Sequence, residues 1–103
     1  MDVVEYEIRQ EQAATIGRLA RELRDALEAL DAFDRRASSK TAAHDRERRR
    51  ARLVDAAASA LWHFIVQREC SGFRDTEEVL KDYAVPAAVR AKMGAVRPRQ
   101  RAG

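Results

Sequence analysis

Apolar residues recur at intervals of three and four along the first third of the chain. This is the spacing of a helix that buries one face. The stripe includes one glutamine and consists of Ile8, Gln12, Ile16, Leu19, Leu23, Leu27 and Leu30. Asp2 and Glu5 have the spacing of a capping box, in which a side-chain acceptor is followed three residues later by glutamate. Together these features predict a long helix over about residues 3–36.

Residues 38–41 (SSKT) interrupt this pattern, and their hydroxyl groups can cap a following helix. A second stripe then predicts a helix over about residues 42–70, which ends near Gly72. This stripe consists of Leu53, Val54, Ala57, Leu61, Phe64, Ile65 and Arg68. Two long helices joined by a short loop form an antiparallel hairpin, which would place Leu23 near Ala57.

The segment ALWHFIVQREC (residues 60–70) has more large apolar residues than one seam requires. At 100° per residue, Trp62 lies about 100° and Val66 about 140° around the helix from Leu61. These two side chains cannot both face the first helix. Either the C-terminal part of the chain or a second copy covers them, and both arrangements can coexist.

The C-terminal part is predicted to form two short helices, over about residues 76–84 and 86–93. Asp75 and Glu78 repeat the capping-box spacing, Pro86 favours the start of a helix, and Gly94 favours its end. The predicted fold class is therefore all-α, with a long antiparallel hairpin and two short helices packed on it. Residues 1–94 would form one domain, and residues 95–103 a basic flexible tail.

Composition agrees with one helical domain, because the 103 residues contain only 4 glycines and 2 prolines. Cys70 is the single cysteine, so no disulfide can form within the chain. The acidic N-terminal segment has no apolar run typical of a signal peptide. No stretch approaches the roughly 20 apolar residues that span a bilayer. We therefore expect a cytoplasmic protein without a membrane role.

Charge alternates in blocks along the chain. The net charge is −4 over residues 1–35, +5 over 36–52, −3 over 53–85 and +5 over 86–103, which sums to the formal +3. We expect the acidic end of the first helix to pair with the basic start of the second, between Glu28, Asp31 and Asp34 and the arginines of residues 46–52.

No catalytic, metal-binding or cofactor-binding residue is predicted. The chain has no glycine-rich phosphate loop, nucleophile elbow or paired-cysteine metal motif. His44 and His63 lie too far apart to share a metal. Cys70 follows His63 by seven residues, or about 10 Å along a helix, whereas a nucleophile and its base need about 3 Å. We therefore expect a protein that is not an enzyme.

Three segments resemble a small all-helical bacterial family of unassigned function. They are VEYEIRQEQAATIGRL, ALWHFIVQREC with GFRD, and DYAVPAAVRAKMG. The resemblance implies a bacterial, stand-alone helical domain. It implies no catalytic or binding residue.

The sequence favours an interaction or assembly module that forms a homo-oligomer, with a dimer as the leading arrangement, or that binds an unknown protein. The predicted tertiary or partner surface consists of Trp62, Phe64, Val66, Phe73 and Tyr83. The alternative is a nucleic-acid-binding accessory protein, because the two short helices have a helix-turn-helix outline with basic residues after the turn. Its contacts would be Arg90, Lys92, Arg97, Arg99 and Arg101.

Overall fold

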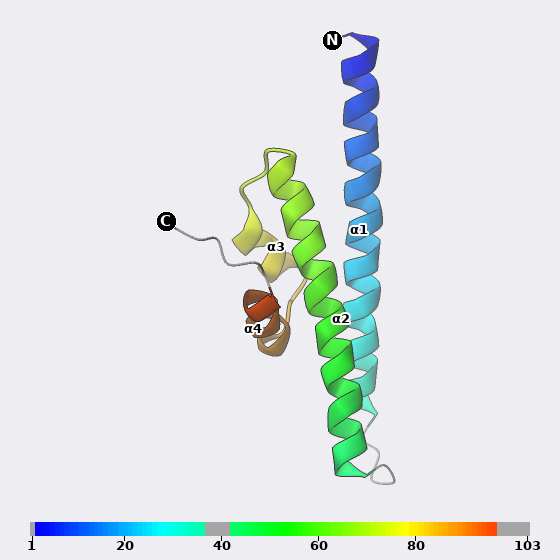
Figure 1. Cartoon of the computed structure of the whole chain (residues 1–103), viewed down its shortest axis with the longest axis vertical. Coiled ribbons are helices and arrows are strands. Elements are labelled where there is room, and N and C mark those ends of the chain that lie inside the picture. Colours follow the sequence, from blue (N-terminus) through cyan, green and yellow to red (C-terminus); the bar gives the residue numbers. More distant parts are fainter. Residues whose placement is uncertain (1, 37–41, 97–103) are drawn as a thin grey trace.

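The structure is a computed structural model that describes residues 2–36 and 42–96. These residues contain four helices and no strand. The helices are α1 (Val3–Arg35), α2 (Ala43–Cys70), α3 (Thr76–Asp82) and α4 (Ala87–Val96). Helices α1 and α2 run side by side in opposite directions, and α3 and α4 lie against the same side of the hairpin (Figure 1). The predicted all-α hairpin with two short C-terminal helices is confirmed.

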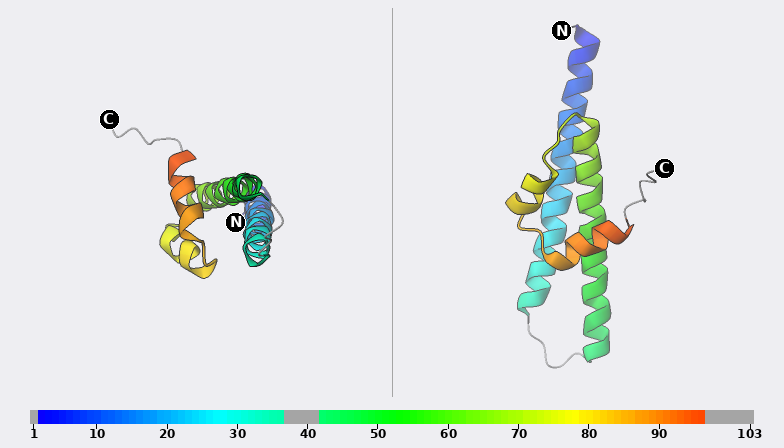
Figure 2. Two further views of the ribbon diagram at one scale, coloured as in Figure 1. Left: turned by 90° about the horizontal axis from the view of Figure 1, so that it is seen from below. Right: turned by 90° about the vertical axis from the view of Figure 1, so that its left-hand side faces the viewer.

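Helix α2 is the central element of the fold. It packs against α1 along one side and against α4 along another, and α4 crosses α2 at a steep angle (Figure 2). The seam with α1 therefore uses only part of the apolar surface of α2. Another part of that surface faces the C-terminal helices, which accounts for some of the large apolar residues in 60–70, whereas Trp62 and Val66 stay half-buried.

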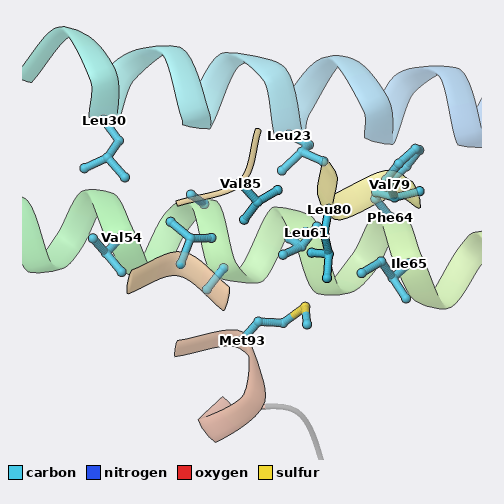
Figure 3. Close-up of a cluster of buried hydrophobic side chains, with 13 residues drawn as sticks. Leu23, Leu30, Val54, Leu61, Phe64, Ile65, Val79, Leu80, Val85 and Met93 are labelled. Atoms are coloured by element: carbon cyan, nitrogen blue, oxygen red, sulfur yellow. The ribbon is translucent and has the colours of Figure 1, made fainter. Parts of the chain in front are cut away.

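The hydrophobic core lies between α1, α2 and the C-terminal segment. Leu23 and Leu30 point from α1 toward α2, and Met93 points toward α2 from α4 (Figure 3). The largest fully buried side chains are Leu23, Leu30, Leu61, Ile65 and Val89. Burying each such side chain contributes roughly 1.5–3 kcal/mol. The C-terminal helices are thus part of the core, and Trp62 packs against its edge.

Two of the predicted helix ends are confirmed. The Asp2 side chain accepts a hydrogen bond from the Glu5 N–H at 2.8 Å, which caps α1. Helix α2 ends at Cys70, where Gly72 adopts φ +97° and the Phe73 N–H bonds back to the Arg68 carbonyl at 3.0 Å. Such a left-handed turn favours glycine, which explains the sharp stop.

Other predicted ends were wrong. The N-cap of α2 is Ala42, which makes no side-chain cap, and the predicted capping residues 38–41 lie outside the described residues. The carboxylate of Asp75 does not cap α3, because Arg68 binds it instead.

Helix α4 begins after Pro86, at Ala87, and continues through Gly94 to Val96, so the tail is not irregular from residue 95. Glycine costs only about 1 kcal/mol in a helix interior, which lowers helix stability without forcing an end.

Candidate interaction surface

The aromatic residues predicted to form a surface lie mostly inside the fold. Phe64 is buried, and its ring meets the ring of Tyr83 edge-on, with centroids 5.5 Å apart. Trp62 is half-buried and lies edge-on to His63, with ring centroids 5.2 Å apart. Val66 is also half-buried. The structure therefore gives Phe64 and Tyr83 a tertiary contact, and leaves Trp62 and Val66 at the rim of the core.

Arg68 organises the turn between α2 and α3. Its Nε donates a hydrogen bond to Asp75 Oδ1 at 3.1 Å, and its Nη2 donates a second one to Asp75 Oδ2. Its guanidinium carbon lies 4.2 Å from the ring centroid of Phe73 and 5.5 Å from that of Phe64. The hydrogen bond from Arg68 lowers the pKa of Asp75, and the same bond raises the pKa of Arg68. This cluster holds Phe73 at the surface, where it is 44% exposed.

The first turns of α1 extend past the C-terminal end of α2 (Figure 1). We call residues 3–11 the N-terminal projection. Its large apolar side chains are exposed, at 73% for Val3, 65% for Val4, 53% for Tyr6 and 53% for Ile8. At 100° per residue, Ile8 lies about 40–60° around α1 from the buried Leu23 and Leu30, whereas Val4 lies about 80–100° from them, at the edge of the side that faces α2. The apolar face of α1 thus continues beyond the helix that covers it.

Shallow grooves flank α1 where α2 ends. The first has an apolar floor from Val4 and Ile8 and is lined by Val4, Glu7, Ile8, Glu11, Gln12, Thr15 and Gln67. The second is lined by Arg9, Gln12, Ala13, Ile16, Gly17, Arg68, Ser71 and Phe73. A Cβ built on Gly17 would meet only Arg21 Nη1, at 3.6 Å. Close packing of another backbone within the described residues therefore does not explain Gly17.

At the opposite end of the hairpin, the pairing predicted between the helices is found at Asp34, whereas Asp31 pairs with Arg35 of its own helix. Arg50 Nε donates a hydrogen bond to Asp34 Oδ1 at 2.8 Å, and its Nη2 donates another to Oδ2 at 3.1 Å. The bond from Arg50 lowers the pKa of Asp34. Arg46 lies over the ring of Phe33, with its guanidinium carbon 4.5 Å from the centroid.

Two of the basic residues proposed for nucleic acid have acidic neighbours. Arg90 Nη2 lies 3.7 Å from Glu77 Oε1, and Lys92 Nζ lies 3.4 Å from Asp55 Oδ1. The other three, Arg97, Arg99 and Arg101, lie outside the described residues.

Among residues 2–36 and 42–96, no group of three or more His, Cys, Asp or Glu side chains could hold a metal ion. In the same part of the chain, no helix is both long and apolar enough to cross a membrane.

Val4 and Ile8 were not predicted as candidate surface residues. A usable signal was the unequal length of the two predicted helices, 3–36 and 42–70. Folding the chain at residue 40 places residue 70 opposite residue 10, so the preceding turns of the first helix have no neighbour. The predicted helix lengths therefore indicate that the first turns of the first helix are uncovered. The spacing of apolar residues alone does not show which of them are exposed.

A family model described as a family of unknown function (DUF6665) matches residues 1–101. No curated protein and no solved structure matches the chain. The predicted resemblance to a helical family of unknown function is confirmed, and the bacterial origin that it implied remains a prediction.

Proposed function

The chain belongs to the family of unknown function DUF6665, and we propose that it is a non-enzymatic helical interaction module. The observation that supports this proposal is the N-terminal projection, where Ile8 continues the core-facing stripe and yet is 53% exposed, beside Val4, which is 65% exposed. A second helix packed there would extend the α1–α2 seam. Helices with an apolar face commonly recognise one another in this way.

The projection is a better docking surface than the predicted aromatic surface. Phe64 is already buried, and Tyr83 is half-buried against it. Phe73 is exposed but is held by Arg68 at the edge of the second groove. We therefore place the docking surface on the projection, with Phe73 as its neighbour across that groove.

Nucleic-acid binding remains the alternative proposal, with weaker support. The ion pairs of Arg90 with Glu77 and of Lys92 with Asp55 already place carboxylates beside these cations. Phosphate would be repelled by the same carboxylates. Binding to mixed duplex DNA that weakens steeply as salt rises would revive this alternative.

The proposal is tested by comparing three tagged full-length proteins: wild type, Ile8→Glu and a control, Ala56→Glu. Both replaced residues are exposed helix positions, so neither variant should lose stability. We expect proteins that copurify with wild type and with Ala56→Glu to be lost from Ile8→Glu. Retention of the same proteins by Ile8→Glu would contradict the proposed docking surface.

A further inference from the structure

The acidic residues of the N-terminal projection restrict what can dock on it. In residues 2–11, which are the projection and its N-cap residue Asp2, four acids stand against one base: Asp2, Glu5, Glu7, Glu11 and Arg9 give a net charge of −3. Asp2 and Glu5 are explained by the start of α1. The Asp2 carboxylate caps the helix, and the negative charge of Glu5 is stabilised by the positive end of the helix dipole. Glu7 and Glu11 lie beyond the first turn, where this effect has faded.

Neither Glu7 nor Glu11 has an ion-pair partner within the part of the chain that the structure describes. Both are exposed, and both line the groove whose floor is Val4 and Ile8. On a helix, Glu11 lies about 60° to one side of Ile8 and Glu5 about 60° to the other. Glu5 pairs with Arg9 at 4.0 Å, so the carboxylates without an ion-pair partner, Glu7 and Glu11, border the apolar floor on one side.

Resting on the proposed function, we propose that the partner at this groove is a basic amphipathic helix of another protein. Its apolar stripe would pack on Val4 and Ile8 in line with the end of α2. Lysine or arginine on one flank of that stripe would meet Glu7 and Glu11, which have no ion-pair partner among the described residues. Charges at the edge of such a contact select the partner by attraction and by repulsion of the wrong one.

The same charges disfavour a symmetric contact between two projections. In a two-fold dimer each projection would meet its own copy, so a segment of net charge −3 would face another of −3. The projection is also short, so few apolar contacts would offset this repulsion. A homodimer of this chain would therefore use a different surface.

The proposal is tested with labelled 18-residue helical peptides and the full-length protein, by fluorescence anisotropy at low and moderate salt. One peptide has a leucine stripe flanked by lysine, the second has the same stripe flanked by glutamate, and the third has lysine flanks but serine in place of leucine. We expect only the first to bind, with an affinity that falls as salt rises. Equal binding of the first and second peptides, or no binding by the first, would overturn the proposal.

A charge-reversal variant locates the binding site. Reversal of two exposed ion pairs changes the binding free energy by about 1.4 kcal/mol, or tenfold in affinity. We expect this loss for Glu7→Lys with Glu11→Lys. The control Glu47→Lys with Glu78→Lys changes net charge equally but lies on α2 and α3, and should bind as wild type does. Equal losses in both variants would show non-specific attraction and overturn the assignment.

The same variants separate this inference from the proposed function. If Ile8→Glu loses its copurifying proteins while Glu7→Lys with Glu11→Lys keeps them, the projection is a docking surface but its partner is not basic. If neither variant loses them, both proposals fail. Sedimentation of wild type and of the reversal variant adds an independent readout, because self-association through the projection should not appear in wild type at low salt.

Discussion

The apolar side chains at the two ends of α1 differ sharply in burial. Leu23 and Leu30, in the C-terminal half, are 0% and 1% exposed, whereas Val4 and Ile8 are 65% and 53% exposed. The difference arises from the neighbour, because α2 ends before it reaches the first turns of α1 (Figure 1). Periodicity therefore identifies the face of a helix that can be buried. The length of the opposing helix decides how much of that face is buried.

The largest expected effect separates these halves directly. Leu23→Ala should lower the free energy of unfolding by about 2–5 kcal/mol, because it opens a cavity in the core. Ile8→Ala, which removes a side chain of similar size, should change it by less than about 0.5 kcal/mol, because that side chain is already in water. Urea unfolding at low protein concentration measures both. Equal losses would mean that the projection is covered in solution, contrary to the described structure.

Several elements of the fold followed from the sequence because local chemistry determines them. The Asp2 cap, the stop at Gly72 and the Asp34–Arg50 pairing each depend on residues near one another in sequence or in the hairpin register. The role of Asp75 could not be predicted in this way. Its spacing from Glu78 indicated a cap, yet Arg68, seven residues earlier, binds its carboxylate across the turn. The capping-box spacing was misleading here, because the Asp75 carboxylate accepts hydrogen bonds from Arg68 and not from the first turn of α3.

The next largest effect is expected at the turn that ends α2, because this turn limits how far α2 can cover α1. Arg68→Ala removes both hydrogen bonds to Asp75 and the contacts with the rings of Phe64 and Phe73. We expect a loss of about 1–2 kcal/mol in unfolding free energy, of which the ring contacts are a large share. Asp75→Asn should cost less, since the ring contacts remain. Arg52→Ala, at an exposed position of α2 away from the turn, is the control and should cost least.

Amide hydrogen exchange would show where the Arg68→Ala loss arises. Exchange in residues 71–75 should accelerate, while exchange near Leu23 should keep pace with global unfolding. Uniform acceleration over the whole chain would mean that Arg68 supports the core as a whole and not the turn.

A smaller effect is expected at Gly17, which lies between the two halves of α1. Gly17→Ala should stabilise the protein by about 0.5–1 kcal/mol, because alanine favours the helix and its Cβ would meet only Arg21 Nη1, at 3.6 Å. Gly94→Ala, in α4, is a matched control, because nothing lies within 4 Å of the added carbon. Thermal unfolding measures both. A loss of stability for Gly17→Ala alone would reveal a close neighbour at that position in solution.

The smallest effect concerns the closed end of the hairpin. The ion pair between Asp34 and Arg50 is bidentate, but the two side chains are 40% and 41% exposed. A double-mutant cycle with Asp34→Asn and Arg50→Gln should therefore give a coupling free energy below about 1 kcal/mol.

Acid should remove the Asp34–Arg50 coupling, because Arg50 holds the pKa of Asp34 below its ordinary 3.8. A lowered folded-state pKa means that the stabilisation is complete above the unfolded-state value and is lost as the pH falls through the folded-state value. Wild type and Asp34→Asn should therefore differ most at neutral pH and converge below about pH 3.8. A difference that grew on acidification would show that Asp34 is stabilised when protonated. The closed end would then depend on something other than this ion pair.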